Sequence, residues 1–429
     1  MLAKLFSFKL KTLEVKQEVI GGFINFMAVA YIVAVNPLIL NANGAGFPIN
    51  ATITSTVLII IVMTMLASFV IKLPFVLAPG MGINAIVAYT LVLHNKLPVP
   101  TVLGVIFFSS LLLFIFSITK IRQIIITAIP QTIQVSLSAG IGLFLFLIGI
   151  KNINLVVANP NTIISAGHLS IDIVLSLVGF LLAIVLFMKK KSYAFLLPII
   201  LITVINCVLH PSSLPKNFIQ MPDFSLIMQI DLFAALKLSL LPTILLIFIV
   251  NFFDATSTSL GLLSQLHFNS PQEKALYLRR ALITDGGAGV LSGLVGTSPS
   301  VIFVESSAAI QNGANTGLAS FVTALLFIPF IFMAPIIGAI PSIATAPILM
   351  LVGLLMFSHI RQIEFNHFEE MVASFLTIIM MPLCFSITAG AVFGIISYTV
   401  LKLLLGKRIE VPISLIIITI LCAGWFFVE

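Results

Sequence analysis

Apolar segments long enough to cross a membrane follow one another along almost the whole chain. A bilayer core requires roughly 20 consecutive apolar residues per helix. Of the 429 residues, 60% are hydrophobic and only 8% are charged, whereas soluble domains carry roughly a quarter charged residues. The sequence therefore predicts an all-α polytopic, multi-pass membrane protein. The fourteen predicted spans are about 22–40, 51–71, 75–93, 100–118, 131–150, 171–188, 193–209, 232–260, 278–296, 300–311, 317–339, 342–357, 368–383 and 386–405.

The two ends of the chain carry segments of a different kind. Basic and apolar residues alternate in 1–20, without a long apolar core or a small-residue cleavage site. We therefore expect a cytoplasmic interfacial helix there and no signal peptide. At the other end, 412–428 is apolar and follows Lys407 and Arg408. It either crosses the membrane or lies in the interface.

Basic residues predict the orientation. With the N-terminus in the cytoplasm, the predicted spans leave only Lys96, Lys151, Lys216 and Lys237 outside, and the rest of the 21 lysines and arginines inside. This distribution is typical of a bacterial plasma (inner) membrane protein. The net charge of +7 is thus explained by topology and does not indicate nucleic-acid binding. The three cysteines are scattered and predict no metal site.

Two predicted spans are interrupted near their middle. In 74–84, Pro79 and nearby glycines break the helix, and in 299–309 a β-branched run precedes small residues. Both patterns indicate a short strand followed by a half-helix. They are the third and tenth spans, so they hold equivalent positions in two sets of seven, and because seven is odd the second set is inverted. Such a pair indicates a binding site near the membrane midplane.

Two carboxylates lie deep in this predicted architecture. Asp254 is in the eighth span and Glu305 is in the interrupted tenth span. A charged side chain at membrane depth costs several kcal/mol, so an acidic residue there is a functional candidate. The alternative for both is a polar contact that only holds helices together.

Several short motifs, taken together, resemble those of a known transporter family. The chain is similar to the AzgA-like purine permeases, a branch of the nucleobase–ascorbate transporter group. The chain departs from the family's pattern in three places: relatives usually carry an acidic residue in place of Asn251, a glycine within Ser257-Thr258, and an arginine near Asn315. The matching pieces are 21–31 (GGFINFMAVAY), Asn36-Pro37, 78–85 (APGMGINA), 253–256 (FDAT), 296–298 (GTS), 304–306 (VES) and 316–317 (TG).

The resemblance implies a fold and an activity. It implies two inverted seven-helix repeats, divided into a core domain that holds substrate and a gate domain. On this reading the core comprises 21–125 and 216–340, and the gate comprises 126–215 and 341–429. The family takes up adenine, guanine or hypoxanthine with protons. Proteins of this fold often form homodimers through the gate domain.

The predicted substrate site suits a flat purine edged with N–H donors and ring-nitrogen acceptors. Asp254 and Glu305 would accept N–H bonds, and Asn84 could both donate and accept. Phe303 could cover the ring, and Thr258 lies on the same helix face as Asp254. Ser306 completes the predicted set. The alternatives are a helix cap for Asn84, core packing for Phe303 and a bond to a backbone carbonyl for Thr258.

Proton coupling is predicted from three deep acids. The spans contain no deep Lys, Arg or His to pair with Asp254, Asp285 and Glu305. Burial favours a protonated carboxyl, whereas a helix N-terminus at Glu305 favours the anion, so such a group can change charge during transport. For Asp285, an interaction with Arg279 and Arg280 is the alternative. Sodium coupling is a further alternative.

Other function classes fit the sequence less well. The chain has no HExxH, no GxSxG and no ligand cluster, so we expect no enzyme, no cofactor and no bound metal. A transporter of another nucleobase or of a small anion on the same fold is the alternative to purine uptake. Deep carboxylates without a deep cation disfavour an anion. The expected partners are a purine, a proton or sodium, and the lipid bilayer.

Overall fold

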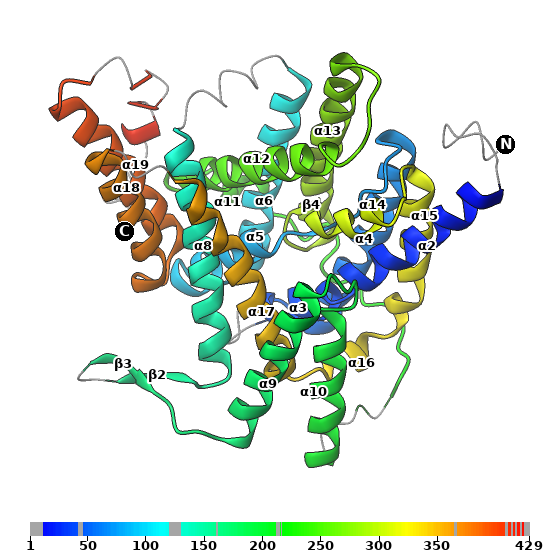
Figure 1. Cartoon of the computed structure of the whole chain (residues 1–429). Coiled ribbons are helices and arrows are strands. Elements are labelled where there is room, and N and C mark those ends of the chain that lie inside the picture. Colours follow the sequence, from blue (N-terminus) through cyan, green and yellow to red (C-terminus); the bar gives the residue numbers. More distant parts are fainter. Residues whose placement is uncertain are drawn as a thin grey trace.

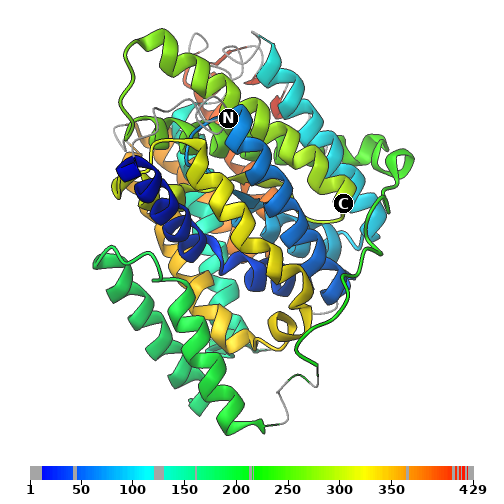
Figure 2. The same ribbon diagram turned by 90° about the vertical axis from the view of Figure 1, so that its right-hand side faces the viewer.

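The computed structural model describes residues 12–41, 46–119, 130–159, 162–211, 215, 217–363 and 367–407, and a few positions beyond. Residues 1–11 and most of 412–428 lie outside the described residues, so the predictions for those parts have no structural outcome. Figure 1 shows the helical body and Figure 2 shows it turned by 90°.

The first half of the chain forms the following elements. They are α2 (Thr12–Val29), α3 (Ile32–Leu40), α4 (Ile49–Val70), β1 (Leu77–Pro79), α5 (Met81–Ala85), the π-helix η2 (Ile86–His94), α6 (Val99–Ile118), α8 (Gln131–Asn152), the hairpin β2 (Val156–Asn159) and β3 (Ile163–Ala166), α9 (Ile171–Met188) and α10 (Leu196–Leu209).

The second half repeats this order with different connections. Its elements are α11 (Leu232–Ala235), η4 (Leu238–Leu240), α12 (Leu241–Leu263), α13 (Pro271–Val295), β4 (Ser300–Ile302), η5 (Val304–Ser306), α14 (Ser307–Gln311), α15 (Gly317–Phe327), η6 (Ile328–Phe332), α16 (Ala334–Gly338), α17 (Ser342–Phe357), η7 (Ser358–Gln362), α18 (Phe368–Leu383) and α19 (Ile387–Leu404).

The all-α membrane architecture predicted from the sequence is confirmed. Among the described residues, eight helices are long and apolar enough to cross a membrane, and Met81–His94, Leu196–Leu209 and Gly317–Phe332 are shorter apolar helices. Together with α13, α18 and the segment from β4 to α14, they correspond to the fourteen predicted spans. The two predicted interruptions are also present, because β1 and β4 each precede a short helix.

Helix α2 runs unbroken from Thr12 to Val29, past residue 20, where the interfacial helix was predicted to end. Glu18, in this helix, is only 4% exposed. Its Oε1 accepts the backbone N–H groups of Asn315 and Thr316, at 2.8 and 3.0 Å. A carboxylate there satisfies N–H groups at the beginning of α15. A residue expected at the interface is thus part of helix packing, and α15 lies beside α2 and α4 (Figure 2).

Helices pack in two groups. One group contains α2–α6 with α11–α16, and the other contains α8–α10 with α17–α19. The second group is held by a close crossing of α8 and α17. A Cβ on Gly142 would lie 2.5 Å from the carbonyl oxygen of Gly353, and one on Gly353 would lie 2.6 Å from that of Gly142. Only glycine allows two backbones to approach this closely.

Candidate functional site

The two interrupted segments meet as a pair of antiparallel strands. Leu77 is opposite Ile302, and Pro79 is opposite Ser300. The N–H of Phe303 donates to the carbonyl of Val76, at 2.9 Å, beyond the end of this register. Each strand is three residues long, and a half-helix begins one residue after its end, at residues 81 and 304. The fold thus brings Asn84 and Glu305, predicted from separate repeats, to the same crossing.

Glu305 is held in place by a residue that the predicted site did not include. The hydroxyl of Tyr31 donates to Glu305 Oε1 at 2.8 Å. Tyr31 lies between α2 and α3, is 1% exposed, and stacks on Phe195 with ring centroids 4.9 Å apart. It ends the matched stretch 21–31 and is one of only five tyrosines, which is the signal that could have identified it.

Asp254 lies beside the crossing strands. Its side chain is exposed although the residue lies within α12, and α12 packs against both β4 and η5 (Figure 1). If Asp254 is ionised, its charge would act on the carboxyl groups of Glu305 and Asp285. The structure therefore brings together the three acids expected from the sequence. Glu305 is half-buried and Asp285 is fully buried.

Asn84 belongs to a buried polar network and does not cap its helix. Its Oδ1 accepts a hydrogen bond from the hydroxyl of Ser298, which also lies 3.0 Å from Asn36 Oδ1. Asn36 Nδ2 in turn donates to Thr56 and Thr297, at 2.7 and 3.0 Å. Among the described residues Asn84 Nδ2 has no hydrogen-bond partner. The network therefore leaves both N–H donors of the Asn84 amide available to a ligand or water.

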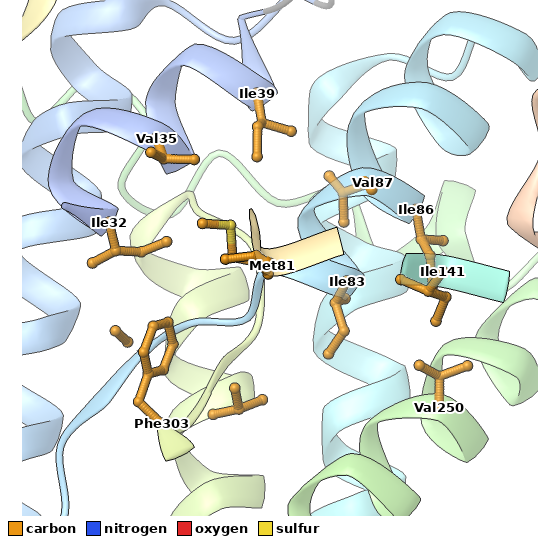
Figure 3. Close-up of a cluster of buried hydrophobic side chains, with 14 of the residues drawn as sticks. Ile32, Val35, Ile39, Met81, Ile83, Ile86, Val87, Ile141, Val250 and Phe303 are labelled. Carbon is orange, nitrogen blue, oxygen red and sulfur yellow. The ribbon is translucent and has the colours of Figure 1, made fainter. Parts of the chain in front are cut away.

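The remaining predicted residues take different positions. Phe303 is 5% exposed and points toward Ile32 and Met81 in an apolar cluster (Figure 3). Ser306 is fully buried, and its hydroxyl accepts the N–H of Val76 at 3.0 Å, so it fastens the strand pair. Thr258 is half-buried one turn beyond Asp254. Direct substrate contact by these three side chains stays a prediction.

Asn251 is a second polar residue that the predicted site omitted. It lies one turn before Asp254 and is 1% exposed. Within the described part of the chain, neither atom of its amide has a hydrogen-bond partner. A buried amide without partners is costly, so this position is a candidate for contact with water or ligand.

Comparison with known proteins identifies the family. A sequence profile described as Permease family, for xanthine and uracil permeases, matches residues 16–395. The chain belongs to this permease family. This permease is 32% identical to the adenine permease AdeP of Escherichia coli, over 98% of the chain and 95% of that protein. It is 32% identical to the guanine/hypoxanthine permease PbuO of Bacillus subtilis, over 99% of both. The resemblance to purine permeases is confirmed, and the protein is a transporter and not an enzyme.

Solved structures support the fold of this permease. The transmembrane domain of the cyanobacterial bicarbonate transporter BicA superposes with a TM-score of 0.66 at 17% identity, covering 90% of this chain and 99% of that one. The murine anion transporter Slc26a9 in its inward-facing state gives 0.67 at 11% identity, covering 94% and 71%. These proteins have the inverted-repeat fold of core and gate domains, which the permease shares.

Proposed function

We propose that this permease imports a purine nucleobase (adenine, guanine or hypoxanthine) by proton symport with alternating access. It would do so across the plasma (inner) membrane of a bacterium, with its N-terminus in the cytoplasm. The names of the relatives support the substrate class, since they include adenine and guanine/hypoxanthine permeases. We assign the two helix groups to the core and gate domains, which would move relative to each other.

One observation carries the proposal. Two carboxylates of the second repeat, the exposed Asp254 and the half-buried Glu305, lie beside the buried crossing of β1 and β4, because α12 packs against both β4 and η5. Carboxylates accept N–H groups strongly, and a purine edge carries such groups. Asn84 adds an unpartnered donor for a ring nitrogen. A base lacking the matching N–H would leave a carboxylate without a partner, which favours selectivity.

The same two acids suit proton coupling. Two like charges close together destabilise each other, so the pair favours uptake of one proton. In the described part of the chain, the ion pairs at Lys402 and Lys407 lie in α18 and α19 and beyond, away from Asp254 and Glu305. We therefore assign the proton to the pair Glu305 and Asp254.

The test is uptake of labelled adenine, guanine, hypoxanthine and uracil by cells that lack their own purine permeases. Wild type is compared with Glu305→Gln, with and without a protonophore, and in sodium-free medium. We expect purine uptake that collapses with the protonophore, survives sodium removal and is lost in the variant. Glu273→Gln is the matched control, because the amide can still accept the N–H of Asn269 that Glu273 Oε2 accepts at 2.9 Å.

Three outcomes would contradict the proposal. Uptake that needs sodium and is unaffected by the protonophore would show that sodium, and not the proton, is the coupling ion. Uracil uptake without purine uptake would show that the substrate is a pyrimidine and not a purine. Full purine accumulation by Glu305→Gln would remove Glu305 from both binding and coupling.

A further inference from the structure

Strand β4 is bonded along both of its edges. One edge pairs with β1, through which Phe303 donates to Val76. On the other edge the N–H of Ile302 donates to Asp285 Oδ1 at 2.7 Å, and the N–H of Ser300 donates to the hydroxyl of Ser292 at 2.9 Å. Asp285 and Ser292 are seven residues apart on α13, which places them on one helix face. Side chains on this face of α13 therefore accept the N–H groups that a third strand would otherwise accept.

The first repeat contains the same arrangement with a neutral side chain. Strand β1 lies against α4, the second span, as β4 lies against α13, the ninth. The N–H of Leu77 donates to Thr64 Oγ1 at 3.1 Å, and the same hydroxyl lies 3.2 Å from the carbonyl oxygen of Leu77. A hydroxyl is thus enough to hold a strand edge in this fold. The second repeat uses a carboxylate where the first uses a threonine.

The two strands also lead to functional candidates of different charge. Strand β1 leads to the neutral Asn84, whereas β4 leads to Glu305, three residues after Ile302. When ionised, Asp285 would hold its strand more firmly than Thr64 can, because a hydrogen bond to a carboxylate is roughly twice as strong as a neutral one. Asp285 is fully buried, and Oδ2 has no hydrogen-bond partner among the described residues. Burying this carboxyl group therefore costs solvation free energy, because Oδ2 loses its hydrogen bonds to water.

We propose that Asp285 is a positioning residue, which fixes β4 through Ile302 and so sets Glu305 against Asp254. Asp285 acts through the strand and does not touch the purine. The acidic group whose charge would act on Asp285 is Asp254 on α12, a helix that packs against α13. For its effect on transport, the inference rests on the proposed function of Glu305; the fixing of the strand itself does not.

Substitutions at Asp285 separate position from charge. Asp285→Asn keeps an oxygen that can accept the N–H of Ile302 but cannot carry a proton, whereas Asp285→Ala removes both properties. We expect Asp285→Asn to keep its KM within about threefold and to keep the pH profile of uptake. Asp285→Ala should raise KM about tenfold or more, which is the size expected for losing a bond to a charged group.

Hydrogen–deuterium exchange of the purified permease in nanodiscs tests the strand without any substrate. The amide of Ile302 should stay protected in wild type and Asp285→Asn, and exchange faster in Asp285→Ala. Thr64→Val is the matched control in the other repeat. It should speed exchange at Leu77 and leave Ile302 unchanged. If wild type takes up no purine, the proposed function fails, while these exchange rates still decide the role of Asp285.

The inference is overturned by either of two results. If Asp285→Asn keeps Ile302 protected but loses proton-driven accumulation or shifts the pH profile, Asp285 carries a proton. If Asp285→Ala leaves both protection and KM unchanged, Asp285 does not position the strand. Should Asp285→Ala fail to fold, Ser292→Ala removes the milder bond on the same edge. Unchanged exchange at Ser300 in that variant would equally contradict the proposed role of α13.

Discussion

Tyr31 and Glu305 are 274 positions apart in the sequence, yet they share a hydrogen bond at the centre of the site. Tyr31 is held by stacking on Phe195 of the gate group and is almost completely buried. Its hydroxyl therefore approaches Glu305 with little freedom to move away. At the scale of single residues, the neutral hydroxyl of Tyr31, between α2 and α3, orients the Glu305 carboxylate, for which the sequence predicted no partner.

Replacing Tyr31 by Phe tests this orientation. The variant keeps the ring and its stacking but removes the donor, so we expect KM for the purine to rise about tenfold to hundredfold. Initial uptake rates over a range of purine concentrations give the measurement. Phe195→Leu is the control, since it removes the stacked ring and leaves the hydroxyl. An unchanged KM in Tyr31→Phe, with the same amount of protein in the membrane, would show that Glu305 needs no such donor.

At the scale of elements, charged residues join the ends of α8, α18 and α19. Lys402 is 1% exposed and lies 2.9 Å from Glu370 Oε1 and 3.3 Å from Glu369 Oε1. Glu370 Oε2 also accepts the hydroxyl of Thr132 at 2.9 Å. Glu369 in addition pairs with Lys407, which is one-third exposed. This cluster lies at the beginning of α18 and the end of α19, so it ties the gate helices at one side of the membrane.

Lys402→Met should destabilise the gate group strongly. Removing Lys402 leaves the partly buried carboxylate of Glu370 without its counter-charge, which is destabilising, whereas Glu369 keeps Lys407. Thermal unfolding of the purified permease in detergent measures the effect. Lys407→Met is the comparison, and the exposure of Lys407 predicts a much smaller change. Equal melting temperatures for the two variants would mean that burial of Lys402 does not determine the strength of the cluster.

At the scale of the whole molecule, aromatic rings bridge the two helix groups. Tyr89 of η2 lies against Phe144 of α8 and Phe385 before α19, with ring centroids 5.9 and 5.5 Å apart. Phe144 and Phe385 lie 5.2 Å from each other, and Lys151 Nζ is 4.6 Å from the Phe385 ring centroid. If core and gate move relative to each other during transport, Tyr89 has to leave this cluster in each cycle.

A disulfide across the two groups should therefore stop transport. In a background without the native cysteines, Tyr89→Cys with Phe385→Cys is oxidised, and uptake is measured before and after adding reductant. We expect uptake to be abolished by oxidation and restored by reduction. Phe144→Cys with Phe385→Cys is the matched control, because both positions lie within the gate group and their link leaves relative motion free. Continued uptake by fully cross-linked Tyr89 and Phe385 variants would refute movement at this contact.

The sequence determined the features of this permease that depend on local composition. Membrane spans follow from runs of apolar residues, because the bilayer itself selects them. The helix break in the third span follows from Pro79 and nearby glycines. The deep acids Asp254 and Glu305 stand out because charge is costly at that depth. These properties can be read over a few residues at a time, and the family motifs are equally local.

Only the tertiary structure decided which distant residues meet. The bonds from Tyr31 to Glu305 and from Ile302 to Asp285, and the burial of Glu18 against α15, each join segments that no local pattern connects. Hydrophobic patterning specifies that a helix is buried but not which neighbour fills its remaining hydrogen bonds, because that choice depends on how all the helices pack together. The acids could therefore be found in the sequence, whereas the pairing of each acid with the residue that holds it could not.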